Sequence, residues 1–271
     1  MNRRSVTTSI IFFCMGLSSP LFSAFFQKTI QLAPHEKCVF SQQGEDGIIA
    51  QLFKYIPPTS YFAVEFGVLP NDLFSNTKNL IMHKGFRRIC WDGEQEDFST
   101  NIYKEWVTRE NINDLFRKYQ VPEDVDFVSI DIDNNDFYIW QALEYRPKIV
   151  CIECNRSHGP REDKVVPYHE TINRAENFDP SLPASYTDYF GASPLALLRL
   201  GRHKGYSLVY IEQNAVNMFF VRDDLIKEYN LQFKHCNILE HLYKPSPLHI
   251  PYPGETHYIS SEMAFQMFPT H

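Results

Sequence analysis

The chain has 271 residues, of which 44% are hydrophobic, 15% aromatic and 22% charged. This composition excludes a disordered or fibrous protein and allows one sizeable hydrophobic core. The net charge of −7 argues against an extended nucleic-acid-binding surface, because such a surface needs many basic side chains facing the phosphates. Six cysteines are too few for a disulfide-based scaffold of this length, so we expect the fold to rest on its core.

The N-terminus has the pattern of a targeting segment. Residues 1–4 contain two arginines, and residues 5–27 carry no charge. The apolar block at 10–17 has the length of a signal-peptide core, whereas a membrane-spanning helix needs about 20 apolar residues. We expect residues 1–28 to be a signal peptide, or an uncleaved anchor that associates the protein with a membrane. The protein would be exported or anchored in these cases, and cytoplasmic only if the segment is not a functional signal.

From residue 40 onward, short apolar runs alternate with segments of helical period, which is typical of a parallel sheet with crossover helices. The pattern predicts helices at 44–55, 76–83, 111–119 and 137–143, the third of them capped by Asn111. It predicts strands at 61–66, 87–91, 104–108, 125–132 and 148–154. Right-handed crossovers would bring the carboxyl ends of these strands to one edge of the sheet.

The C-terminal third predicts a helix and a hairpin. Ser193 and Pro194 have the pattern of a helix cap followed by proline at the first helical position. Strands at 206–211 and 216–221 are close enough in sequence to pair as an antiparallel hairpin. We therefore predict one α/β domain over 40–230, followed over 231–271 by an extended tail rich in proline and histidine.

Five short motifs occur in a fixed order along this domain: SQQGEDG at 41–47, VEFG at 64–67, SNT at 75–77, DIDNND at 131–136 and YFGAS at 189–193. In this order they resemble the FkbM-like family of S-adenosylmethionine-dependent methyltransferases. The resemblance implies a Rossmann-like methyltransferase sandwich, with a mostly parallel sheet and an antiparallel C-terminal hairpin. It also implies transfer of a methyl group to an oxygen or nitrogen of a small-molecule or glycan acceptor.

The resemblance assigns cofactor contacts to the end of the first strand. In such methyltransferases an acid there holds the amino group of S-adenosylmethionine, and a glycine lets the backbone approach it. Glu65 and Gly67 match these positions. Residues 68–71 contain no glycine where more are usual, so we expect their side chains to crowd the cofactor.

Further cofactor contacts are expected from the next two strands. Asp92 ends the second strand, where a carboxylate can accept hydrogen bonds from both ribose hydroxyls, and Glu94 is the reserve candidate. Glu110 and Asn111 follow the third predicted strand and could contact the adenine edge. For Asn111, capping of the following helix is an equally good interpretation.

The most concentrated chemistry lies in residues 131–136, where three carboxylates follow a buried strand. Their mutual repulsion requires a cation, a hydrogen-bond network or raised pKa values. Asp131, Asp133 and Glu153 are therefore candidate ligands of Mg²⁺, Ca²⁺ or another divalent cation, and the two aspartates are also candidate catalytic groups. Alternatively, these acids cap the following helix, as Asp136 is expected to do.

A histidine and two cysteines are further candidates for a chemical role. His158 lies in the long segment before the helix at Ser193, where an acceptor-binding lid would sit, and is a candidate base or acceptor contact; a surface histidine with satisfied bonds is the alternative. Cys151 and Cys154 are three residues apart in a predicted strand and so point to opposite faces. We expect buried thiols there.

Three functions are compatible with these observations. The first is the methyltransferase that the resemblance implies. The second is a metal-dependent glycosyltransferase, in which the D-x-D pattern of Asp131 and Asp133 holds a metal and a sugar diphosphate. The third is an exported interaction protein that has kept the fold and lost the cofactor.

Overall fold

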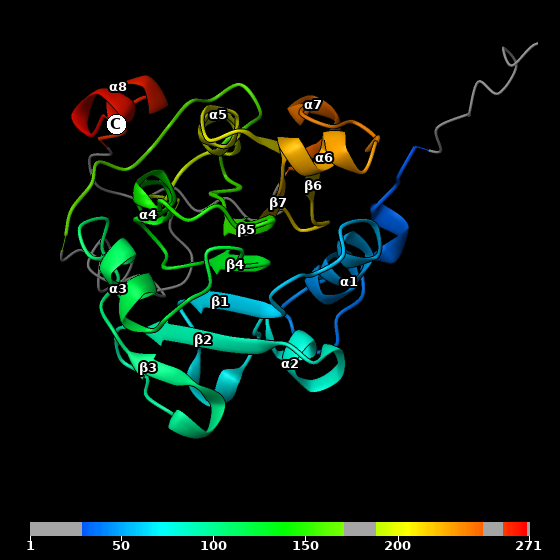
Figure 1. Cartoon of the computed structure of the whole chain (residues 1–271). Helices are drawn as coiled ribbons and strands as arrows, with labels where there is room; N and C mark the ends of the chain where they lie inside the picture. The colour runs from blue at the N-terminus through cyan, green and yellow to red at the C-terminus, as the bar shows by residue number, and fades with distance from the viewer. Residues whose placement is uncertain (1–28, 171–187, 246–256, 270–271) are drawn as a thin grey trace, which may run out of the picture.

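The computed structural model describes residues 29–170, 188–245 and 257–269, and its centre is a seven-stranded sheet in the order β3-β2-β1-β4-β5-β7-β6 (Figure 1). Five strands run parallel, and β7 is antiparallel to both of its neighbours. The strands are β1 (Phe62–Phe66), β2 (Arg87–Asp92), β3 (Ile102–Lys104), β4 (Phe127–Ile130), β5 (Ile149–Glu153), β6 (Tyr206–Ile211) and β7 (Asn217–Arg222). The predicted α/β class, with a mostly parallel sheet and an antiparallel C-terminal pair, is confirmed and is consistent with a Rossmann-like fold.

Helices cover both faces of this sheet. Helices α3, α4 and α5 pack side by side on one face, while α1 and α2 lie on the other (Figure 1). The helices are α1 (Glu45–Tyr55), α2 (Lys78–Lys84), α3 (Ile112–Lys118), α4 (Asp136–Ala142), α5 (Pro194–His203), α6 (Asp223–Glu228), α7 (Leu239–Leu242) and α8 (Ser261–Met267). Because both faces are covered, β1 and β4 are buried along their whole length, which explains why apolar residues predominate in both strands.

Of the two predicted helix caps, one is present in the structure. Ser193 caps α5, its Oγ accepting a hydrogen bond from the Ala196 N–H, and Pro194 occupies the first helical position. Asn111, by contrast, does not cap α3, so that prediction is wrong. Its Oδ1 accepts from the Thr108 N–H at 2.8 Å and its Nδ2 donates to the Trp106 carbonyl at 2.8 Å. The asparagine therefore closes the turn before the helix.

The third strand is shorter and earlier than predicted. It pairs with β2 only from Cys90 to Asp92, opposite Ile102–Lys104. The prediction of a strand at 104–108 is wrong because β2 ends at Asp92, and residues beyond 105 have no ladder to join. As a result, the residues that directly follow the third strand are 105–107, and not 109–111 as predicted.

The C-terminal tail belongs to the same core as the sheet. Residues 231–271 are not simply extended, because α7 and α8 lie within them and Leu239, Leu242 and Ala264 are buried in the main cluster. On the N-terminal side, Ile30 is also buried and pairs with Phe233. The packed unit thus reaches beyond 40–230 in both directions. The proline-rich part at 246–256 lies outside the described residues.

The predicted signal segment at 1–28 also lies outside the described residues. Within the ranges that the structure describes, no helix combines the length and apolar character that crossing a membrane requires.

Candidate functional site

A cleft of about 610 Å³ opens at the carboxyl ends of the parallel strands. Its walls come from the segments that follow β1 to β5 and from the start of β7. Glu65 and Asp131 both line it, so the prediction that these strand ends share one edge is confirmed. Ligands of open α/β sheets bind at this edge, and the cleft is in the size range of a small-molecule site.

The cleft is strongly acidic. Eight carboxylate side chains line it, against a single cationic one, Arg156, among the described residues. The acids are Glu65, Asp92, Glu94, Glu105, Asp131, Asp133, Glu153 and Asp188. A concave surface lined by one sign of charge concentrates ligands of the opposite sign. The cleft therefore favours a cationic ligand.

Glu65 holds the loop between β1 and α2. Its Oε2 accepts from the Ser75 hydroxyl at 2.6 Å and from Thr77, and its Oε1 accepts from the Asn76 N–H at 2.7 Å. Burial raises the pKa of Glu65, although these donors favour its charged form. The SNT motif is thereby explained as the partner of the strand-end acid. The predicted contact of Glu65 with a cofactor amino group stays a prediction.

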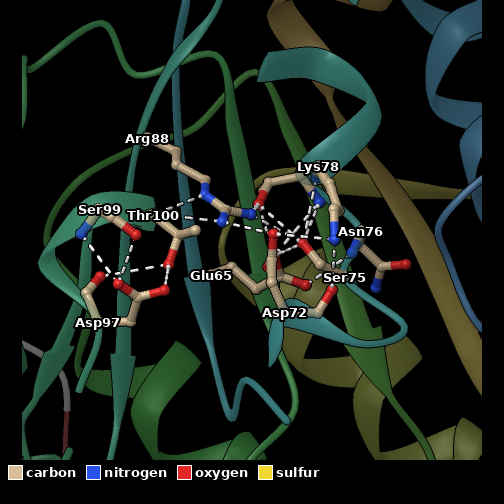
Figure 2. A network of polar contacts seen from close by, with 10 residues as sticks. Glu65, Asp72, Ser75, Asn76, Lys78, Arg88, Asp97, Ser99 and Thr100 are labelled. Atoms are coloured by element: carbon tan, nitrogen blue, oxygen red, sulfur yellow. Dashed lines mark hydrogen bonds and ion pairs between the residues drawn. The ribbon is translucent and has the colours of Figure 1, made fainter. Parts of the chain in front are cut away.

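A buried ion pair braces the same loop (Figure 2). Arg88 Nη2 lies 2.7 Å from Asp72 Oδ2, and both side chains are 4% exposed. Arg88 also donates to Ser75, to Thr77 and to the Thr100 carbonyl. Sequence analysis missed this pair, whose only local signal is an arginine at the second position of β2, before its apolar centre.

Val68, Leu69 and Pro70 of the loop after Gly67 line the cleft, and the expected crowding of the cofactor by their side chains stays a prediction. Val68 is buried against Cys90 and Ile102, while Asn71, Asp72 and Phe74 adopt left-handed backbone conformations without being glycine. Such conformations cost energy and persist where the surroundings hold them, here through the Asp72 ion pair.

Gly67 allows two strand ends to touch. Its φ is +73°, and a Cβ at this position would lie 1.5 Å from the carbonyl oxygen of Asp131. Gly67 therefore allows close approach of the Asp131 backbone, while its predicted contact with a cofactor stays a prediction. This contact places the end of β4 beside the end of β1.

The Asp92 carboxylate is held in position through one of its two oxygens. Its Oδ1 accepts from the N–H groups of Glu94 and Gln95, at 2.8 and 2.7 Å. Its Oδ2 has no hydrogen bond to the described residues, and Asp92 lines the cleft. Next to it, the Trp106 ring covers Gly93, whose Cβ would meet the ring at 2.6 Å. With the buried Val107, Trp106 forms an apolar wall of the cleft. Sequence analysis missed this wall because it placed both residues inside the predicted strand at 104–108.

The structure does not bring three of the predicted residues into the cleft lining. Glu110 and Asn111 lie before α3, where Glu110 accepts from the Tyr168 hydroxyl and pairs with Arg109. His158 is only 6% exposed and packs its ring edge-to-face on Tyr258. The loop from 155 to 158 turns back at the end of β5, with the His158 N–H donating to the Asn155 carbonyl. This turn directs the histidine into the protein.

The acidic cluster does come together. Asp131, Asp133 and Glu153 offer carboxylate oxygens that all lie within 4.8 Å of one another. Asn217 is the ladder neighbour of Glu153; its Nδ2 donates to Glu45, and its buried Oδ1 has no hydrogen-bond partner. Carboxylate and amide oxygens are ligands that Mg²⁺ and Ca²⁺ use, so this set fits a divalent cation.

Asp136, Cys151 and Cys154 have contacts within the protein at or near this edge of the sheet. Asp136 Oδ1 accepts from the Ile132 N–H at 2.8 Å and closes the loop that leads into α4. Cys151 and Cys154 are free, buried thiols, as predicted, and burial raises the pKa of both.

No protein-family model matches this chain, and no curated protein is detectably similar to it in sequence.

Proposed function

We propose that the protein is an S-adenosylmethionine-dependent methyltransferase that acts on an oxygen or nitrogen of a small-molecule or glycan acceptor. The observation that carries this proposal is the charge of the cleft, in which eight carboxylates face one arginine. S-adenosylmethionine carries a cationic sulfonium and an ammonium group, whereas a nucleotide sugar carries an anionic diphosphate. The first suits this cleft and the second is repelled by it.

The residues at the strand ends fit the parts of this cofactor. Asp92 can accept both ribose hydroxyls, because its backbone-bonded Oδ1 keeps the carboxylate in place and Oδ2 faces no other donor among the described residues. The wall of Trp106 and Val107 can cover a planar base. When bound, the cofactor supplies an electrophilic methyl group.

The chain's own residues would then orient the acceptor and take up its proton. Asp131 and Asp133 lie beside the end of β1, where a carboxylate can accept the proton of an acceptor hydroxyl or amine. A cation on these residues and Glu153 could instead bind the acceptor oxygen directly. In both arrangements the main contribution of the protein is alignment of the acceptor with the methyl group.

Replacing Asp92 by asparagine should weaken S-adenosylmethionine binding by about 1.5–3 kcal/mol, or roughly 10- to 150-fold. The asparagine can keep the turn to Glu94 and Gln95, but it loses one charged acceptor for the ribose. Calorimetry with the full chain and S-adenosylmethionine measures the change in affinity. Glu123→Gln, an exposed acid outside the cleft, should leave affinity unchanged. Full affinity in Asp92→Asn would dismiss this contact and move the role to Glu94.

The same calorimetry separates the other two functions. The cation-binding set of Asp131, Asp133 and Glu153 is the observation that favours sugar transfer. Heat from a nucleotide sugar with Mg²⁺, and none from S-adenosylmethionine, would replace our proposal by the glycosyltransferase. The absence of heat from both would favour the interaction protein.

Neutralising one member of the acidic cluster should stabilise the protein while removing its response to cations. Asp131→Asn and Asp133→Asn each relieve repulsion among three close carboxylates, so we expect a gain of about 0.5–2 kcal/mol without ligand. Mg²⁺ or Ca²⁺ should raise the melting temperature of the wild type and of Glu123→Gln, but not of these variants. Lower melting temperatures in both variants, with no shift by cations in the wild type, would instead indicate carboxylates that only hold the loop.

A further inference from the structure

A second cavity, of about 750 Å³, lies between the C-terminal ends of α4 and α5, the start of α3 and the segment after α8. It shares no lining residue with the acidic cleft. Among the described residues its charge is the opposite: four basic side chains, Arg109, Arg146, His203 and Lys204, line it with one carboxylate, Glu144. That carboxylate is already shared with Arg117, at 3.7 Å.

Lys204 is held by backbone carbonyls and not by a carboxylate among the described residues. Its Nζ donates to the carbonyls of Gln141 and Leu143, at 3.2 and 2.9 Å, and no carboxylate pairs with it among the described residues. An ammonium group has three donors, so one remains for a ligand. Burial and the neighbouring Arg146 lower the pKa of Lys204 to about 8.

Two further polar atoms of the lining residues are buried without a partner. Arg109 stacks its guanidinium on the Phe268 ring at 3.7 Å, yet its Nε has no acceptor. Gln141 donates through Nε2 to the Phe268 carbonyl at 2.7 Å, which leaves its Oε1 without a donor. Both atoms are buried, so neither can contact a ligand in the cavity unless its side chain moves.

A purely structural explanation accounts for only part of this arrangement. Lys204 and His203 lie at the C-terminal end of α5, and Lys204 also covers carbonyls at the end of α4, where helix dipoles favour cations. Arg109 precedes α3 and Arg146 lies beyond the end of α4. Neither position needs a positive charge for the helices.

We propose that this second cavity binds an organic anion, such as a sulfated or phosphorylated sugar. The anionic oxygens would accept from Lys204 Nζ, which has a donor to spare, and from the exposed Arg146. The cavity is much larger than an inorganic anion, which leaves room for the sugar. This site does not depend on the methyltransferase proposal, because it shares no residue with the acidic cleft.

Calorimetry with glucose 6-sulfate, glucose 6-phosphate and glucose tests the site. We expect binding of one or both anionic sugars and none of glucose, and the comparison tells a sulfate ligand from a phosphate ligand. Lys204→Met and Arg146→Met should each weaken binding about tenfold, the loss expected for one charge-assisted contact. Arg146 is exposed, so that variant should fold even if Lys204→Met does not. Lys227→Met, an exposed lysine of α6 outside the cavity, should bind like the wild type.

The pH dependence gives an independent readout. Sulfate keeps its charge between about pH 7.5 and pH 9.5, and ordinary arginine and glutamate side chains do not titrate there. The other titratable groups lining the cavity are Arg109, Arg146, His203, Glu144 and Tyr206, and burial raises the pKa of Tyr206. Affinity for an anion should therefore fall about tenfold over this range in the wild type and stay level in Lys204→Met. Equal binding of glucose, or affinities that none of the cavity variants changes, would overturn the proposal.

Discussion

Replacing Arg88 by methionine is expected to lower the free energy of unfolding by about 3–5 kcal/mol, the range for removing one partner of a buried ion pair. The side chains of Arg88 and Asp72 are 4% exposed, so the variant leaves the buried Asp72 carboxylate with only the more distant Lys78, at 3.6 Å, as a cationic partner. It also removes donors to Ser75 and Thr77, the two side chains that hold Glu65 (Figure 2). Equilibrium denaturation in urea measures the change.

The matched control for this prediction lies next to it in the same strand. Arg87 is exposed and stacks over the Phe62 ring, so Arg87→Met should change stability by less than about 1 kcal/mol. The double variant Asp72→Asn with Arg88→Met should cost clearly less than the two single changes added together, because the two residues form one pair. Equal losses for Arg87→Met and Arg88→Met would show that the buried pair is not a stabilising brace.

The ion pair also matters for the cleft. It holds the 68–74 loop in a conformation with three left-handed residues that are not glycine, and this loop forms one wall of the cleft. We therefore expect Arg88→Met to weaken cofactor binding even under conditions where the protein stays folded. Strained loop conformations of this kind are held by their surroundings and are common at binding sites.

Gly67→Ala is expected to destabilise the protein by about 2–5 kcal/mol. Part of this loss is the cost of a left-handed backbone in a residue with a Cβ. The rest arises because that Cβ would lie 1.5 Å from the Asp131 carbonyl oxygen, so the ends of β1 and β4 must move apart. Thermal and urea denaturation measure the loss.

Gly85 provides a control that separates these two contributions. It has the same φ of +73°, but a Cβ there would meet nothing within 4 Å. Gly85→Ala should therefore cost only about 1–2 kcal/mol, the left-handed backbone contribution alone. If the two variants lose the same stability, the close contact between the strand ends has no energetic consequence, and the placement of Asp131 does not depend on Gly67.

Much of the architecture follows from the sequence itself. Short, mostly apolar runs such as those of β1, β4 and β5 indicate strands buried on both faces, and the cap at Ser193 marks the start of α5. Because parallel strands end at one edge, the order of the strands is enough to place the acids at their ends together. This reasoning identifies Asp92, Asp131 and Glu153, and all three line the cleft.

Tertiary structure decided what depends on contacts distant in sequence. The third strand ends where β2 no longer offers a strand to pair with, and local propensity carries no information about this pairing. As a result, Trp106 and Val107 line the cleft, and Glu110 and Asn111 do not. A turn after β5 directs His158 away from the cleft, and packing of α7 and α8 draws the C-terminal tail into the core. Period and spacing determine which residues are buried or lie at strand ends, because these are local properties of the backbone. Which side chains meet is decided by long-range pairing, since the contact of Arg88 with Asp72 and the lining of the basic cavity join elements that no local pattern connects.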